Sequence, residues 1–292
     1  MAEKQVVSVI DKESRTLPDR LSPSRLSDFT QCPAKFFYAS ILKLPRPATV
    51  ATTVGTLAHE AFERVFDHPA DQRTPEVAIS YILPCWEKLS QRDEYQGLLE
   101  FKDEILNKAQ DSVRSWFLVE RPHNFEPDKR ETRLVASING SEILGIIDRV
   151  DRLDTESGTK VYISDYKTGK PVSPDDRFLD DKFFAMRVYA LLWNILNKEV
   201  PHELRLIYVN GASRDSVRKL RVDERVLKRA EAEVKAITKE MKKCEKDSAW
   251  PCKKQVLCQW CEFQSMCPVW NPELSGMQAG TMRRLPDGSL SD

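Results

Sequence analysis

Asp165 and Lys167 stand two residues apart in KVYISDYK, a stretch whose β-branched and aromatic residues predict a strand. Under the period-2 alternation of a strand, both side chains lie on the same face as Val161 and Ile163. An unpaired charge on a buried face costs on the order of several kcal/mol, so this pair needs a partner such as each other or a metal ion. The alternative is a surface hairpin with ordinary solvated charges, because D-x-K alone is a common triplet.

A second acid lies in the preceding strand-like segment. Asp148 follows an apolar run, and the turn residues DTESG separate its segment from KVYISDYK, so a hairpin can bring Asp148 beside Asp165. Carboxylate oxygens select Mg²⁺ or Mn²⁺, which can polarise a phosphoryl oxygen and lower the pKa of a bound water. Lys167 could hold or deprotonate that water. The chemistry that fits is metal-assisted hydrolysis of a phosphodiester.

These residues carry a family resemblance. The stretch G-I-I-D-R-V-D around Asp148 and the D-Y-K of Asp165–Lys167 resemble motifs II and III of the PD-(D/E)XK nucleases, in the RecB-like branch. The pattern G-T-x-x-H-x-x-F around His59 is similar to motif I of that branch, although a lone histidine on a helix is ordinarily a packing or surface residue. The resemblance implies Asp148, Asp165 and Lys167 as catalytic residues. It implies His59, Asp148, Asp165 and the Tyr166 carbonyl as ligands of Mg²⁺ or Mn²⁺.

The helix predicted for residues 181–198 continues the resemblance with one departure. RecB-like nucleases carry Q-x-x-x-Y here, and the tyrosine matches Tyr189, whereas Ala185 stands at the glutamine position. The resemblance implies that Tyr189 contributes to the catalytic site. A tyrosine buried in the core is the alternative.

Three late cysteines form the most specific pattern in the chain. Cys258, Cys261 and Cys267 have the spacing C-x₂-C-x₅-C, and C-x₂-C places two thiolates on one tight turn, as metal sites do. The same pattern, with one early cysteine, resembles RecB-like enzymes of the AddB type and the related CRISPR-adaptation nucleases.

That resemblance implies a fourth ligand and a cofactor. Cys32 corresponds to the early cysteine, so Cys32, Cys258, Cys261 and Cys267 would bind a [4Fe–4S] cluster that staples the two terminal segments together, with Zn²⁺ as the other occupant that thiolates allow. Cys244 and Cys252 are alternative ligands by proximity, but they do not fit the family spacing.

The surrounding elements follow from hydrophobic periodicity and turn residues. A short helix should begin at Ser22 or Ser24, a second should be entered through Gly55 and Thr56, and residues 75–119 should be helical. Strand-like residues from Glu131 predict a three-stranded meander with the central hairpin. Glu131 is either an additional acid of the site or an edge residue in a salt bridge.

The expected fold is therefore α/β, with a PD-(D/E)XK restriction-endonuclease-like core, a central mixed β-sheet flanked by helices, and an iron–sulfur staple. We expect a flexible N-terminal arm over residues 1–20 and a disordered tail over residues 271–292. Between them, residues 21–270 should form one RecB-like nuclease domain. It would include a helical insertion at about 75–120 and an iron–sulfur segment at 252–270 that works with Cys32.

Composition limits the cellular setting. The 292 residues carry 45 basic and 45 acidic side chains, which argues against a protein that coats nucleic acid by bulk attraction. No apolar run is long enough for a membrane span and the first residues lack a signal-peptide core, so we expect a cytoplasmic protein without a membrane partner. Structural disulfides are rare in that compartment, so clustered cysteines among the seven indicate metal ligands or catalytic thiols.

The expected activity is that of a Mg²⁺- or Mn²⁺-dependent deoxyribonuclease. It would act as an exonuclease on single-stranded DNA ends, in recombination, repair or phage DNA processing. No P-loop pattern occurs in the sequence, so a helicase or another recombination protein is an expected partner. Two alternatives remain: a catalytically inactive, cluster-stabilised DNA-binding module, and a nuclease subunit of a helicase–nuclease or CRISPR-adaptation complex.

Overall fold

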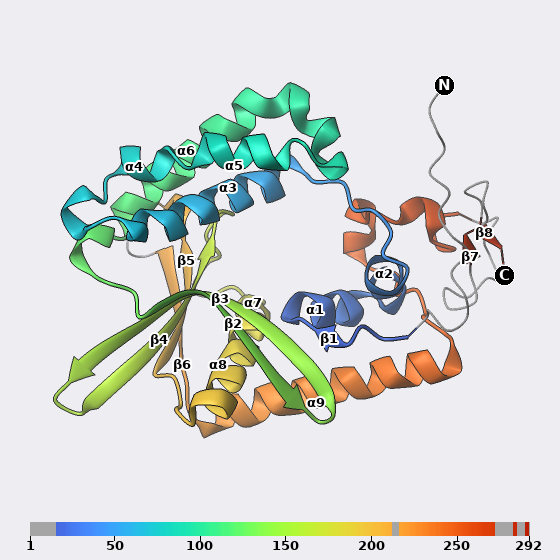
Figure 1. The fold of residues 1–292 in the computed structure, drawn as a ribbon. Coiled ribbons are helices and arrows are strands. Elements are labelled where there is room, and N and C mark those ends of the chain that lie inside the picture. The colour runs from blue at the N-terminus through green and yellow to red at the C-terminus, as the bar shows by residue number, and fades with distance from the viewer. Residues whose placement is uncertain (1–15, 212–215, 272–282, 285–289, 292) are drawn as a thin grey trace. The chain divides into compact units, whose positions relative to one another are not determined.

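The computed structural model describes residues 16–211, 216–271, 283–284 and 290–291. Most of the predicted N-terminal arm and of the predicted tail lies outside these residues. The chain divides into two compact units (Figure 1). The cysteine unit comprises residues 1–46, 137–143 and 232–292, and the sheet unit comprises residues 47–136 and 144–231.

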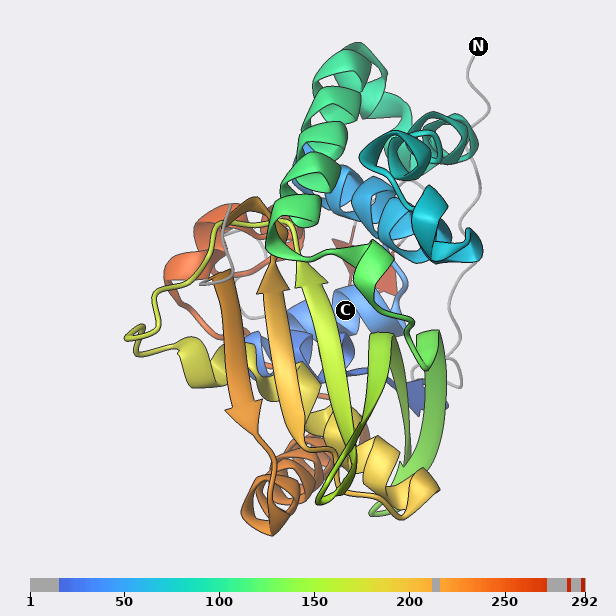
Figure 2. The ribbon, with the colours of Figure 1, turned by 90° about the vertical axis from the view of Figure 1, so that its left-hand side faces the viewer.

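A mixed sheet is built around the predicted hairpin. Its strands are β2 (Lys129–Ile138), β3 (Ser141–Thr155), β4 (Gly158–Lys167), β5 (Glu203–Tyr208) and β6 (Val217–Arg221). Strand β3 pairs with β2 and runs antiparallel to β4, so the predicted meander is confirmed. Strand β5 lies parallel to β4, and β6 runs antiparallel to β5 (Figure 2).

Helices flank this sheet, as the sequence predicts. Within the sheet unit, α3 (Val50–Arg64), α4 (Pro75–Ile79), α5 (Ile82–Leu89) and α6 (Lys102–Val119) pack together (Figure 1). Their core continues to Tyr166 and Ile207, near the carboxyl ends of β4 and β5. Two further helices, α7 (Leu179–Lys182) and α8 (Phe184–Asn197), follow β4, and α8 packs against β4 and β5. Because parallel strands end at the same edge, that edge is where side chains of α3 can reach the strands.

The first turn of α3 differs from the sequence expectation. The helix begins at Val50 rather than at Gly55, because Thr49 and Thr52 form a reciprocal capping box that satisfies the free backbone N–H groups. Gly55 therefore lies inside the helix, where an added Cβ would be 3.4 Å from Thr168 Oγ1. Helix α3 therefore passes close to the turn that follows β4.

The cysteine unit contains α1 (Pro23–Gln31), α2 (Pro33–Phe36) and a π-helical turn over Phe37–Ile41. Ser22 accepts a hydrogen bond from the Arg25 N–H and caps α1, which confirms one of the two predicted caps. Strand β1 (Arg20–Leu21) pairs in parallel with Glu142 and Ile143 of β3. Helix α9 (Glu224–Asp247) is followed by short 3₁₀ turns at Val256–Trp260 and Gln264–Met266, and β7 (Arg283–Arg284) pairs with β8 (Leu290–Ser291).

Aromatic packing joins the two ends of the chain within the cysteine unit. Trp250 is 2% exposed and its ring centroid lies 5.6 to 6.1 Å from those of Phe29, Phe36 and Phe37. The Tyr38 hydroxyl donates a hydrogen bond of 2.9 Å to the Met266 carbonyl. Segments more than 200 residues apart in sequence are thus packed together by ring contacts and a hydrogen bond.

Among the residues that the structure describes, none of the helices combines the length and apolar character that a bilayer crossing requires.

Candidate metal centre

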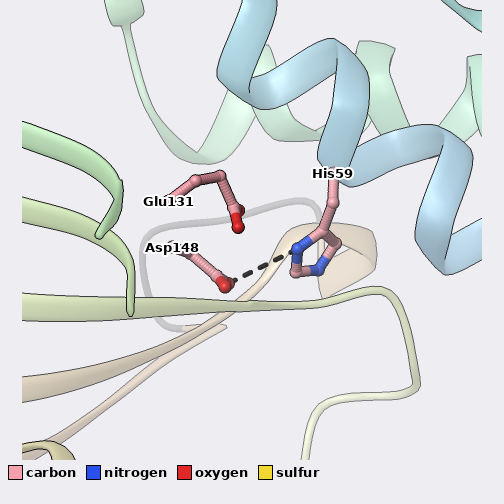
Figure 3. Close-up of side chains that lie close together, drawn as sticks. All are labelled: His59, Glu131 and Asp148. Carbon is pink, nitrogen blue, oxygen red and sulfur yellow. Dashed lines mark ion pairs between the residues drawn. The ribbon is translucent and has the colours of Figure 1, made fainter. Parts of the chain in front are cut away.

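His59 of α3 and Asp148 of β3 meet at the carboxyl-terminal end of β4. His59 Nδ1 lies 3.5 Å from Asp148 Oδ2, and His59 Nε2 lies 3.1 Å from the Tyr166 carbonyl oxygen (Figure 3). The same Asp148 oxygen accepts a 2.8 Å hydrogen bond from the Tyr166 N–H. An imidazole, a carboxylate and a carbonyl oxygen, which sequence reasoning named as ligands, therefore lie together.

Glu131 of β2 joins them. One ligand atom each from His59, Glu131 and Asp148 can be chosen so that all three lie within 4.8 Å of one another, and all three side chains point toward a common space in Figure 3. The backbone of Glu131 has φ 41°, a conformation that side chains other than glycine and asparagine seldom adopt. Such backbone strain tends to occur at functional sites. The sequence left two interpretations of Glu131, an additional acid of the site and an edge residue in a salt bridge. The structure places its carboxylate beside His59 and Asp148, as the first interpretation predicts.

Asp165 and Lys167 of β4 lie next to this group. The β3–β4 register pairs Arg149 with Ser164, so the next position brings Asp148 to the level of Asp165. Lys167 Nζ is 2.5 Å from Asp165 Oδ2, and Asp165 is only 8% exposed. The Lys167 ammonium thus compensates that buried oxygen. A carboxylate keeps further lone pairs, which suit a cation ligand.

The acids of the site hold their protons unusually tightly. Burial, and then the neighbouring Asp165, raise the pKa of Asp148 to about 6, against the opposing effect of His59. Partial burial together with Asp148 raises the pKa of Glu131 to about 7, although part of the Glu131 side chain is open to solvent. Loss of water around Lys167 disfavours its charge, but Asp165 and Asp148 outweigh this and raise the pKa of Lys167. The crowding of carboxylates is the arrangement that a divalent cation relieves.

The space between these groups is small. A cavity of about 10 Å³ is lined by His59, Glu131, Asp148 and Tyr166 among others, which is about the room one water or ion centre needs. Oxygen-rich ligands around a site of this size fit Mg²⁺ or Mn²⁺.

A buried ionic network lies beside the site, and its Arg149 lines the same cavity. Arg149 is 3% exposed and donates two hydrogen bonds, of 2.7 and 2.9 Å, to the Glu120 carboxylate. It also donates to Asp151 at 3.1 Å and to the Tyr166 hydroxyl. Trp116 donates a further hydrogen bond of 3.0 Å to Glu120. The network holds the ring of Tyr166, whose backbone N–H and carbonyl contact Asp148 and His59.

Tyr189 of α8 also faces the site. Burial, and then the carboxylates of Asp165, Asp148 and Glu131, raise the pKa of its hydroxyl, so these groups lie close to it. The ring packs on Gly145 of β3, where an added Cβ would lie 2.9 Å from Tyr189 Cδ1. Gly145 thus leaves the space that Tyr189 occupies. The sequence carries no obvious signal for this contact.

A separate group of thiols lies in the cysteine unit. A cavity of about 220 Å³ is lined by five cysteines, which are Cys32, Cys252, Cys258, Cys261 and Cys267. The Lys253 N–H donates to Cys32 Sγ at 3.4 Å, and the Gln255 N–H donates to Cys258 Sγ at 3.3 Å. Backbone donors of this kind favour thiolates and are common around iron–sulfur sites. The four cysteines named from sequence share this cavity, and Cys252 joins them.

Comparison with known proteins agrees with this arrangement. Residues 20–268 match the sequence profile of the PD-(D/E)XK nuclease superfamily. The chain belongs to the PD-(D/E)XK nuclease superfamily. The matched range contains His59, Asp148, Asp165 and Lys167, together with the cysteine segment.

Two known proteins are similar to this superfamily member. It is 27% identical over 205 residues to one subunit of the ATP-dependent helicase/deoxyribonuclease of Clostridium tetani, an alignment of 59% of this chain and 17% of that protein. The chain therefore spans about a sixth of the length of that relative. A crystal structure from Eubacterium rectale, described as a candidate exonuclease, is similar in fold with a TM-score of 0.54 and 13% identity, over 89% of this chain and 92% of that one.

Proposed function

We propose that this PD-(D/E)XK protein is a metal-dependent deoxyribonuclease that hydrolyses phosphodiester bonds at single-stranded DNA ends. The observation that carries the proposal is the grouping of His59, Glu131 and Asp148 within 4.8 Å beside the Asp165–Lys167 pair. A histidine, several carboxylates and a lysine at one strand end supply both the ligands of a divalent cation and a positive charge for phosphate chemistry.

Each residue would have a distinct task. His59, Asp148, Asp165 and the Tyr166 carbonyl would hold Mg²⁺ or Mn²⁺, with Glu131 as an additional acid. When bound, the cation polarises the scissile phosphate and lowers the pKa of the attacking water. Because the pKa of Lys167 is raised, its ammonium remains charged at neutral pH. Lys167 therefore donates a hydrogen bond to the water or phosphate and offsets developing negative charge, rather than removing a proton.

Tyr189 would contact the substrate beside the cation. Its hydroxyl faces Asp165 and Asp148, and its raised pKa keeps it protonated and able to donate a hydrogen bond to a phosphate oxygen. Ala185 cannot supply the amide that a glutamine would present one turn earlier. We propose that Tyr189 alone fulfils this role on α8.

We propose a [4Fe–4S] cluster as a structural cross-link, held by cysteines of the 220 Å³ cavity. Thiols at one cavity, with backbone N–H donors to the sulfurs of Cys32 and Cys258, supply the ligand set that such a cluster takes. Four cysteine ligands would join residues near Cys32 to residues 258–267.

A helicase is the partner that we propose. The curated relative is named as a subunit of an ATP-dependent helicase/deoxyribonuclease. A nuclease without a P-loop pattern needs another protein to unwind duplex DNA. We propose that residues 21–270 act as one nuclease domain that the cluster stabilises. The family match over residues 20–268 supports this proposal.

The catalytic proposal is tested with end-labelled linear and circular single-stranded DNA in Mn²⁺. Asp165→Ala and Lys167→Ala should each lower the rate at least about 100-fold, as loss of a group that stabilises transition-state charge does. Asp154→Ala is the matched control, because Asp154 is an exposed acid farther along β3 and should leave the rate unchanged. Cleavage of linear but not circular DNA supports the exonuclease mode.

Two results would contradict the proposal. Undiminished cleavage by Asp165→Ala and Lys167→Ala would remove these residues from the chemistry. DNA binding by the wild-type protein with no turnover in Mg²⁺ or Mn²⁺ would favour the alternative of an inactive DNA-binding module.

A further inference from the structure

The cysteine cavity holds one more thiol than a [4Fe–4S] cluster uses. Five cysteines line it, whereas a cubane cluster takes four cysteine ligands. Cys252 is the additional one, and it does not belong to the C-x₂-C-x₅-C pattern. The remaining two cysteines, Cys85 and Cys244, are not among the residues that line the cavity.

Cys252 and Cys267 occupy the same corner of the cavity. Their sulfurs are 3.7 Å apart, and this is the one contact between two cysteine sulfurs among the hydrogen bonds of the described residues. Cys32 and Cys258 instead take backbone hydrogen bonds, from Lys253 and Gln255. A ligand position within reach of Cys267 is therefore within reach of Cys252 as well.

The backbone on both sides of Cys252 is fixed. Trp250, two residues before, is buried among the rings of Phe29, Phe36 and Phe37. The Pro251 carbonyl accepts a 3.3 Å hydrogen bond from the Ala34 N–H. The residue after Cys252 donates its N–H to Cys32 Sγ. Cys252 is thus held facing the cavity by contacts that do not depend on Cys267.

Cys267 is held independently from the other side. The Cys267 N–H donates to the Gln264 carbonyl at 3.1 Å, and the adjacent Met266 carbonyl accepts the Tyr38 hydroxyl. Two separately anchored segments therefore present their thiols to one position.

We infer that Cys252 and Cys267 are interchangeable ligands, either of which completes the cluster together with Cys32, Cys258 and Cys261. This inference rests on the proposed cysteine-bound cofactor and concerns only which thiols bind it. Loss of either thiol of the pair leaves four ligands, whereas loss of Cys258 or Cys261 leaves a position that no other thiol reaches.

The test measures iron, zinc and acid-labile sulfide per chain in anaerobically purified protein, with the visible absorption spectrum. Cys252→Ser and Cys267→Ser should each keep the wild-type metal content. The double variant Cys252→Ser/Cys267→Ser and the single variant Cys258→Ser should fall to less than about a tenth of it. Cys244→Ser is the matched control, because this thiol lies on α9 in the same unit without lining the cavity, and should retain full metal content.

Alkylation with iodoacetamide and peptide mass spectrometry give a second measurement, which starts from the wild-type protein. In metal-loaded wild-type protein, one thiol of the Cys252–Cys267 pair should be alkylated while Cys32, Cys258 and Cys261 are protected. If Cys267 is the protected thiol in the wild type, Cys252 is the alkylated one. In Cys267→Ser, Cys252 should then be protected instead.

The outcomes separate this inference from the proposal beneath it. If the wild type contains metal and the Cys267→Ser variant is folded but contains none, the two thiols are not interchangeable. That result leaves the proposed cluster itself in place. Full metal in the double variant also overturns the pair. Wild-type protein that carries neither iron nor zinc overturns the cysteine site itself and this inference with it.

Discussion

Protons and divalent cations compete for the same carboxylates at the residue scale. Asp148 and Glu131 have pKa values of about 6 and about 7, each raised first by burial and then by nearby acids. Below pH 6 both acids are largely protonated and their mutual repulsion is relieved. Above pH 7 both are ionised, so the attraction for a cation is greatest.

The affinity for Mn²⁺ should therefore rise steeply between pH 5.5 and pH 7.5, by at least about 10-fold, because each acid that must lose a proton adds up to about one decade per pH unit. Isothermal titration calorimetry of the chelator-treated protein measures this. Glu131→Gln should make the affinity for Mn²⁺ less dependent on pH, since one of the two titrating groups is removed. An affinity that does not change across this range would show that these acids do not bind the ion.

Sequence reasoning at the residue scale was most successful where a motif had a regular geometry. The period-2 pattern and the hairpin brought Asp148 to Asp165, and the resemblance supplied His59. Glu131 was left undecided because its position depends on a backbone φ of 41° that no pattern in the sequence announces. Cys252 was set aside because it falls outside the family spacing, although the fold brings it to the cavity.

At the scale of elements, the strand end that bears the site is fixed by the ionic network beside it. Arg149 on β3 joins Glu120, which follows α6, to Tyr166 on β4. Arg149 is buried and Glu120 is mostly buried. Burial alone would raise the pKa of Glu120, but Arg149 holds that pKa below its usual value. Removal of the guanidinium would leave a buried carboxylate unpaired.

Arg149→Met should consequently destabilise the protein by about 3–5 kcal/mol, the usual cost of breaking a buried ion pair. Arg152→Met is the matched control on the same strand, since Arg152 is exposed and its pairs with Asp128 and Glu199 should contribute about 1 kcal/mol or less. Denaturant unfolding curves compare the two variants. Equal losses of stability would contradict a special role for the buried pair.

The order and type of the elements could be predicted because hydrophobic periodicity and turn residues are local. The start of α3 was placed several residues too late, since Gly55 and Thr56 were taken as the entry while the capping box lies at Thr49 and Thr52. Gly55 lies inside the helix, near Thr168, and does not mark its start. The two threonines of the capping box set that start, and glycine is a weaker signal for it.

At the scale of the whole molecule, the chain folds as two compact units whose residues alternate along the sequence. The division was not predicted from the sequence, because three of its four boundaries fall inside β2, β3 and α9 rather than in linkers. The proposed metal ligands all belong to the sheet unit, and the five clustered cysteines all belong to the cysteine unit. Under the proposal, each unit carries a ligand set of its own.

Removal of the proposed cluster should loosen the cysteine unit selectively. The amide protons of Lys253 and Gln255, which donate to Cys32 and Cys258, should exchange at least about 10-fold faster after the metal is removed with a chelator, because the thiols then lose their fixed positions. Amides of β5, in the sheet unit, are the internal control and should exchange at an unchanged rate. Hydrogen exchange with mass spectrometry resolves both regions, and uniform acceleration of both would argue against a local clamp.

The central claim is that His59, Asp148 and Asp165 share one divalent cation. An anomalous-difference map from crystals of the protein grown with Mn²⁺ tests it directly. We predict one strong peak bonded to the His59 ring, to the carboxylates of Asp148 and Asp165 and to the Tyr166 carbonyl, with Glu131 at its side. Absence of that peak at saturating Mn²⁺, or Mn²⁺ bound elsewhere while these side chains remain apart, would contradict the account.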